Sequence, residues 1–114
     1  MSKECIFCRI AKGEIPAEKV METEDFVAFR DINPIAPTHV LIIPREHIPT
    51  LNDLGKEKAH LANGLINAAQ EVAKKSGIAK DGYRIIINCN RAAGQEIFHL
   101  HAHVIGGRQL QGMG

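Results

Sequence analysis

The stretch "IFHLHAHVI" (residues 97–105) alternates apolar and histidine side chains, which is the pattern of a strand with one buried face and one polar face. Because alternate strand residues point to opposite faces, His99, His101 and His103 should share one face, with neighbours about 6.5–7 Å apart. The residues between them should face the core: Phe98, Leu100, Ala102 and Val104. A strand face that is merely rich in histidine is the plain alternative. Strict alternation of three of the chain's six histidines favours a functional site.

The strands expected around this stretch form a mostly antiparallel sheet. "YRIIINCN" (83–90) and residues 97–105 flank the glycine-containing turn "RAAGQE" (91–96), which predicts an antiparallel hairpin. "FVAFRD" (26–31) alternates like a half-buried strand. "THVLIIPR" (38–45) is apolar throughout and reads as a strand covered on both faces. The two prolines of "INPIAP" (32–37) predict a loop between these strands.

One long helix is predicted over residues 56–77, where apolar side chains recur at helical spacing. Its apolar face consists of Leu61, Leu65, Ala68, Ala69, Val72 and Ala73. Gly64 inside this helix suggests that another backbone approaches closely. The segment from Cys5 contains a short apolar stretch of one or two helical turns that breaks at Gly13 and Pro16. One long and one short helix with such a sheet predict an α+β domain.

Composition restricts the class of protein. The chain has 114 residues, which suits one domain, and a formal net charge of +1 with scattered basic residues. We therefore expect neither nucleic-acid binding nor an electrostatic membrane anchor. The start "MSKECIFCRI" lacks the apolar stretch of a signal peptide, so a cytoplasmic location is expected. Three cysteines in a reducing compartment do not make a disulfide framework.

Two kinds of chemistry suit three alternating histidines. Neighbouring pairs of strand histidines can chelate a metal, but His99 and His103 should lie about 13 Å apart at the backbone, too far for one ion to reach both easily. In the second kind of chemistry, the middle imidazole attacks an electrophile such as phosphorus, while a flanking imidazole accepts or donates protons. A neutral imidazole can present Nε2 as the nucleophile when an acceptor holds Nδ1–H.

Groups suited to a phosphate and a ribose are placed around the histidines. The turn at Gly94 offers backbone N–H groups, and Gln95 offers a side-chain donor. Asn88 precedes this turn on the neighbouring strand. Asp31 ends a strand and can accept hydrogen bonds from ribose hydroxyls; a solvated turn residue is the alternative.

These blocks resemble a known family. "HLHAHVI" has the His-φ-His-φ-His-φ-φ form of the histidine triad (HIT) family, and "RDINPIAPTHVLIIPREHI" and "DGYRIIINCNRAAGQEIFHLHAHVIGGR" resemble its Hint branch, the purine nucleotide-binding phosphoramidases. The resemblance runs from about Ile6 to Arg108. It implies a single HIT domain over residues 1–114, with about five strands, that dimerises into a continuous sheet, each subunit contributing its sheet and long helix.

The resemblance also implies an activity: hydrolysis of the P–N bond in purine nucleoside 5′-phosphoramidates, including lysyl-AMP-like adducts, which releases AMP and an amine without a metal. By position, His101 matches the nucleophile that becomes a nucleotidyl-histidine, His103 the residue beside the leaving group, and His99 the residue that supports His101. The implied nucleotide-binding positions are Asp31, Ile32, His39, Asn88, Gly94, Gln95, Glu96, His101 and His103. Glu96 is a departure, because many Hint proteins carry a serine there; the carboxylate either turns away from the phosphate or binds the cationic amine.

Cys5 and Cys8 form a CxxC pair, which is half of a zinc site. In several triad proteins such a pair joins two histidines, which by position are His47 and His99 here, to make a structural zinc site. Two buried thiols that pack a short helix are the alternative. A redox pair is less favoured, because no thioredoxin-like βαβ pattern surrounds it.

Two other functions compete with the phosphoramidase. Dinucleoside polyphosphate hydrolases use similar triad chemistry on a P–O–P bond, but they typically carry Gln where this chain has His103. A nucleotide-binding regulatory protein with incidental hydrolysis would use the same pocket.

Overall fold

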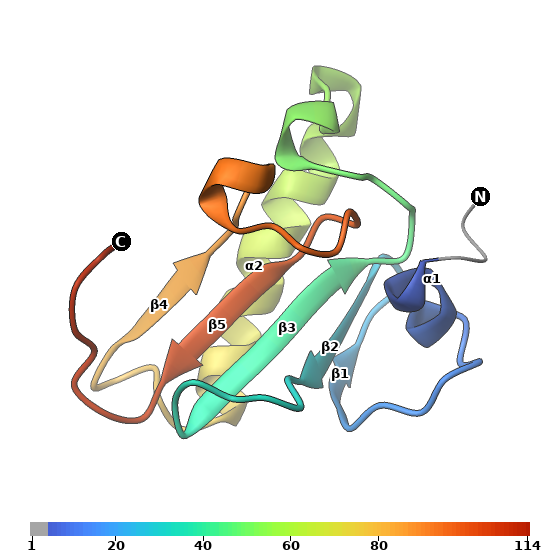
Figure 1. The fold of residues 1–114 in the computed structure, drawn as a ribbon. Coiled ribbons are helices and arrows are strands. Elements are labelled where there is room, and N and C mark those ends of the chain that lie inside the picture. Colours follow the sequence, from blue (N-terminus) through green and yellow to red (C-terminus); the bar gives the residue numbers. More distant parts are fainter. Residues whose placement is uncertain (1–4) are drawn as a thin grey trace.

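The computed structural model describes residues 5–114, which form one antiparallel sheet and two α-helices (Figure 1). The strands are β1 (Lys19–Glu22), β2 (Phe26–Arg30), β3 (Thr38–Pro44), β4 (Tyr83–Ile86) and β5 (Ala102–Gly106). They lie in the order β1-β2-β3-β5-β4, and every neighbouring pair is antiparallel. The helices are α1 (Ile6–Ala11) and α2 (Ala59–Lys75), with 3-10 turns η2 (Leu51–Asp53), η3 (Lys56–Lys58) and η4 (Arg91–Ala93). The predicted α+β class is confirmed, and β1 is an additional strand.

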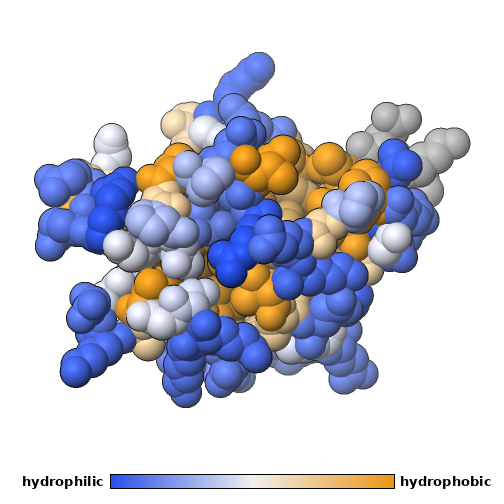
Figure 2. Space-filling view, turned by 90° about the horizontal axis from the view of Figure 1, so that it is seen from below, coloured by the Kyte–Doolittle hydropathy of each residue, from blue (hydrophilic) through white to orange (hydrophobic). Residues whose placement is uncertain are grey.

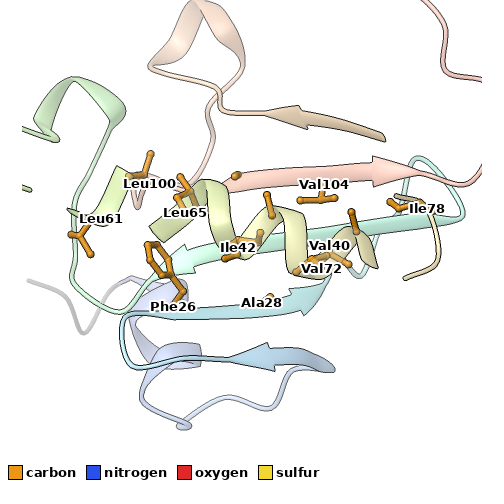
Figure 3. Packing of buried hydrophobic residues seen from close by; sticks show 14 of the residues in the cluster. Phe26, Ala28, Val40, Ile42, Leu61, Leu65, Val72, Ile78, Leu100 and Val104 are labelled. Carbon is orange, nitrogen blue, oxygen red and sulfur yellow. The ribbon is translucent and has the colours of Figure 1, made fainter. Parts of the chain in front are cut away.

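Helix α2 covers one face of the sheet, behind the strands in Figure 1. Its buried side chains are Leu61, Leu65, Ala68, Ala69, Val72 and Ala73, which are the residues predicted from the periodicity. They pack on alternate residues of the central strands, including Ala28, Val40 and Val104 (Figure 3). Burial of this apolar stripe, more than intrinsic propensity, holds the helix.

Helix α1 packs on the opposite face and makes a second apolar cluster. Phe7 and Ile10 of this helix contact the other alternate residues of the sheet, among them Val27, Phe29 and Leu41. Strand β2 is therefore buried on both faces, and its expected half-buried character is wrong. Strand β3 is buried along its whole length, as predicted.

The predicted hairpin exists, but its strands are shorter and its connection longer than expected. Tyr83 pairs with Gly106 and Ile86 with His103, while residues 87–101 form no strand. Hydrogen bonds to residues far away in the sequence replace the strand pairing there: the Leu100 backbone N–H donates to the carbonyl of Ile48 at 2.6 Å. His99 and His101 therefore precede β5, and only His103 lies on it.

Gly64 allows the close approach of a side chain, where the approach of a backbone was expected. A Cβ atom at this position would lie 2.7 Å from Cε2 of Phe26 on β2. The missing side chain lets α2 sit over the Phe26 ring.

The end of the molecule at which β3 begins carries exposed apolar surface (Figure 2). Hydrophobic residues gather near the middle of this view, and hydrophilic residues surround them. The connection 31–37 between β2 and β3 lies at this end and exposes Ile32 and Ile35. Within residues 5–114, none of the helices has the length and apolar character needed to cross a bilayer.

Candidate active site

The alternation of the triad persists although its first half is not a strand. Leu100, Ala102 and Val104 face the α2 core, as predicted. Phe98 does not: its side chain is 46% exposed, because the chain has left the sheet at this point. The ring of Phe7 from α1 lies against the opposite face, with its centroid 5.9 Å from that of His99 and 5.1 Å from that of His101.

His101 is buried and holds a defined tautomer. Its Nδ1 lies 2.8 Å from the carbonyl oxygen of His99, so Nδ1 carries the hydrogen and donates it. Burial lowers the pKa of His101, and the His99 carbonyl and the carboxylate of Asp31 oppose that shift in part. The ring is therefore neutral near pH 7, with a free lone pair on Nε2.

His103 holds the opposite tautomer because of His39. The backbone N–H of Ile35 donates to Nδ1 of His39 at 3.1 Å, so the hydrogen of this neutral ring is on Nε2. That nitrogen lies 2.9 Å from Nδ1 of His103 and 3.4 Å from Oδ2 of Asp31. His103 thus accepts at Nδ1 and carries its own hydrogen on Nε2. Burial, followed by the neighbouring His101 and His39, lowers the pKa of His103 to about 4.

The same bonds argue against a metal at this cluster. The ligand atoms of Asp31, His39 and His103 lie within 4.8 Å of one another. However, a metal on Nε2 of His39, together with the Ile35 bond to Nδ1, would require a ring with no hydrogen on either nitrogen. A neutral imidazole carries one, so the cluster is better suited to moving or holding protons.

His99 faces away from the other two rings of the triad, toward the cysteines. Its Nε2–H donates to the carbonyl of Pro44 at 2.8 Å, which leaves a lone pair on Nδ1. Nδ1 lies 3.3 Å from Sγ of Cys5, 3.5 Å from Sγ of Cys8 and 3.2 Å from Nδ1 of His47. Burial is the main reason that the pKa of His99 falls to about 4, which keeps this lone pair free at neutral pH. The four residues of the predicted metal site therefore come together.

A cavity of about 500 Å³ opens beside His101 and His103. The predicted residues Asp31, Ile32, Asn88, Gly94 and Glu96 line it. Its apolar wall was missed by sequence reasoning and includes Phe7, Ile10, Ile15, Phe29 and Leu41. These residues carry no signal distinct from ordinary core residues. A larger hollow, of about 670 Å³, is lined by Tyr83, Arg84 and Arg108 and contains none of the triad histidines.

Gln95 is placed differently from the expectation. Its side chain is buried and lies outside the lining of the histidine cavity. The amide accepts from the backbone N–H of Asn90 at 2.7 Å and donates to the carbonyls of Pro49 and Ile97 at 2.9 and 3.1 Å. The N–H groups of Gly94 and Gln95 bond to carbonyls within the same turn. This amide braces the turn, and its expected donation to phosphate finds no support in these contacts.

Known proteins share this sequence and fold. The HIT domain family matches residues 12–110. A purine nucleoside phosphoramidase of Escherichia coli (strain K12) is 48% identical over 110 residues, covering 96% of this chain and 92% of that protein. The crystal structure of a HIT family hydrolase from Legionella pneumophila Philadelphia 1 superposes with a TM-score of 0.92 at 47% identity, covering 94% of this chain and 96% of that one. A Zn-bound histidine triad family protein from Mycobacterium smegmatis gives a TM-score of 0.82 at 37% identity, covering 95% and 78% of the two chains.

The resemblance expected from the triad and its neighbouring blocks is confirmed by these matches, and so is the five-stranded HIT fold with one long helix. The chain belongs to the HIT domain family.

Proposed function

We propose that the protein hydrolyses the P–N bond of purine nucleoside 5′-phosphoramidates and releases a nucleoside monophosphate, such as AMP, and an amine. The relatives named as a phosphoramidase and as HIT family hydrolases support a hydrolase. The observation that carries the proposal is the pair of complementary tautomers in one cavity: a lone pair on Nε2 of His101 and a hydrogen on Nε2 of His103.

The first step forms a nucleotidyl-histidine. The lone pair of His101 Nε2 attacks phosphorus, the P–N bond breaks, and the leaving nitrogen takes its electron pair. The His99 carbonyl, which accepts from Nδ1–H, stabilises the positive charge that develops on the His101 ring. The leaving amine also needs a proton. Because the substrate phosphate is anionic, its binding raises the pKa of His103 and favours the imidazolium that supplies this proton. The imidazolium carries a hydrogen on Nδ1 as well, so the Nε2–H of His39 then turns from His103 to Oδ2 of Asp31, which lies 3.4 Å away.

In the second step, water attacks the same phosphorus. Its proton passes to His103, now neutral, and the bond to His101 breaks to release the nucleotide. The apolar wall of the cavity suits a purine base, and Asp31, which lines the same cavity, would accept hydrogen bonds from the ribose. Asp31 already makes one hydrogen bond within the protein: its Oδ1 accepts from the backbone N–H of Asn33 at 2.8 Å. This bond fixes the orientation of the carboxylate.

The test is AMP release from adenosine 5′-phosphoramidate by the intact protein and by a His101→Ala variant. We expect turnover by the former, loss of turnover in the latter, and a single nucleotidyl adduct on His101 in quenched samples by mass spectrometry. No turnover by the intact protein despite AMP binding would refute the phosphoramidase proposal for this substrate. Turnover of a dinucleoside polyphosphate instead would support the competing hydrolase.

The cysteine and histidine set fits a structural zinc ion. A tetrahedral ion with bonds of about 2.0–2.1 Å to nitrogen and 2.3 Å to sulfur places its ligands about 3.3–3.8 Å apart. The separations here are 3.2 Å between the two nitrogens and 3.2–3.5 Å between nitrogen and sulfur. We propose that Cys5, Cys8, His47 and His99 hold zinc, which supplies a positive charge that stabilises thiolates. Burial raises the pKa of Cys8 to about 11, so a cation beside it is needed for that form.

We also propose a homodimer that continues the sheet through β4. Strand β4 is the last in the sheet order and is only partly buried, and Ile66 on α2 is 45% exposed. Light scattering coupled to gel filtration measures the mass directly. A cytoplasmic location completes the proposal, because none of Cys5, Cys8 and Cys89 forms a disulfide.

A further inference from the structure

Glu96 is the carboxylate of the catalytic cavity that has no ion-pair or hydrogen-bond partner within residues 5–114. Three carboxylates line this cavity, those of Glu18, Asp31 and Glu96. Glu18 accepts from Nε of Arg30 at 2.9 Å, and Asp31 accepts from the backbone N–H of Asn33 at 2.8 Å. Glu96 is exposed and makes no such bond to the described residues. Its negative charge is available to whatever enters the cavity.

The backbone on both sides of Glu96 is anchored. Gln95 before it is held by its three amide hydrogen bonds. Ile97 after it packs against the apolar cluster of Phe7 and Phe29. The carboxylate therefore starts from a fixed point beside the reacting histidines, although its side chain is free to turn.

Glu96 stands where two hollows meet. With Gly94 it lines both the cavity of His101 and His103 and a neighbouring hollow, which Arg91, Gln95 and Phe98 complete. Phe98 is the ring that was expected in the core and is instead 46% exposed. A carboxylate and an exposed aromatic ring lining the same hollow suit an aliphatic ammonium group, because both attract a cation.

We propose that Glu96, with Phe98, forms the subsite of the leaving amine and selects amines that carry a second positive charge beyond the scissile nitrogen. This inference rests on the proposed function. The carboxylate repels the anionic phosphoryl group, so its attraction acts only on the part of the substrate that extends past phosphorus. Arg91 lines the same hollow as Glu96 and Phe98, and its positive charge repels the ammonium group that Glu96 attracts.

Two adenosine 5′-phosphoramidates that differ only at the far end of the amine provide the test. One carries n-pentylamine and the other 1,4-diaminobutane, so an ammonium replaces a methyl group. The measured quantity is the ratio of kcat/KM for the charged substrate to that for the neutral one. We expect the intact protein to favour the diamine and Glu96→Gln to lower the ratio by about fivefold, the upper range for an exposed ion pair.

Two further variants test whether the charge of Glu96 sets the ratio. Glu24→Gln removes an exposed carboxylate that lines neither hollow, and it should leave the ratio unchanged. Arg91→Gln removes the opposing cation and should raise the ratio. A ratio that Glu96→Gln leaves unchanged overturns the proposal, and so does a ratio that falls in Arg91→Gln.

The affinity of the same two compounds separates this inference from the proposed function. Calorimetry on a His101→Ala protein, with and without Glu96→Gln, measures binding without turnover. If the intact protein hydrolyses neither compound and does not hydrolyse adenosine 5′-phosphoramidate, the phosphoramidase proposal fails. The ratio of the affinities for the charged and the neutral compound still tests Glu96. A fivefold fall in this ratio on adding Glu96→Gln supports the subsite, and a ratio that Glu96→Gln leaves unchanged refutes it.

Discussion

Replacing Gln95 with alanine should destabilise the fold more than it weakens nucleotide binding. The substitution leaves three backbone partners without their hydrogen bonds: the N–H of Asn90 and the carbonyls of Pro49 and Ile97. Each unpaired buried group costs about 1–3 kcal/mol, and water can reach some of them in the variant. We therefore expect the free energy of unfolding to fall by about 2–4 kcal/mol, with a decrease in melting temperature on the order of 10 °C.

Urea unfolding at fixed protein concentration measures this loss, and Gln70→Ala on the exposed face of α2 is the matched control. The control should shift the free energy of unfolding by no more than about 0.5 kcal/mol. If Gln95 instead donated a hydrogen bond to the substrate phosphate, its loss would weaken substrate binding and leave stability unchanged. If Gln95→Ala keeps its stability while KM for the phosphoramidate rises tenfold, the bracing role inferred from the structure is wrong.

Three further perturbations follow from the described contacts. Cys8→Ser should lower zinc content below one ion per chain and reduce the melting temperature, measured by metal analysis and calorimetry; full zinc occupancy in the variant would contradict the four-ligand site. Stability should decline as pH falls from about 6.5 toward 4, because the pKa of His103 is lowered to about 4 by burial and the unfolded chain takes up the proton first. His103→Gln should weaken the pH dependence of the free energy of unfolding, measured by urea denaturation. An unchanged pH dependence would contradict the role given to His103. Gly64→Ala should not stabilise the protein despite a gain of about 1 kcal/mol in helix propensity, because Cβ would lie 2.7 Å from the Phe26 ring; a higher urea midpoint would show that the ring moves freely.

The regular parts of the fold could be predicted because they depend on periodic burial. The apolar face of α2 repeats at helical spacing, and β3 is apolar throughout, so a local pattern reports the tertiary environment in both cases. The segment 87–101 could not be predicted in the same way. Its geometry depends on bonds to Ile48 and Pro49, which lie about 50 residues earlier, and no local pattern encodes such partners.

At the site, the residue types were predictable, but their protonation was not. The alternation of His99, His101 and His103 and the CxxC pair indicate from sequence alone which side chains gather at the site. The position of each hydrogen depends on a carbonyl or an N–H from elsewhere in the fold, such as the Ile35 N–H beside His39. The exposure of Phe98 was likewise hidden, because alternation continues in the sequence after the strand has ended.

Helix α1 has only six residues, too few to be stable in isolation. Its order comes from its contacts, and two of its faces serve different sites: Cys8 belongs to the proposed zinc site, and Phe7 lines the cavity of His101 and His103, where we propose that the nucleotide binds. Any ligand that holds this helix in place therefore improves both sites together. By thermodynamic reciprocity, zinc should tighten nucleotide binding by the same factor by which the nucleotide tightens zinc.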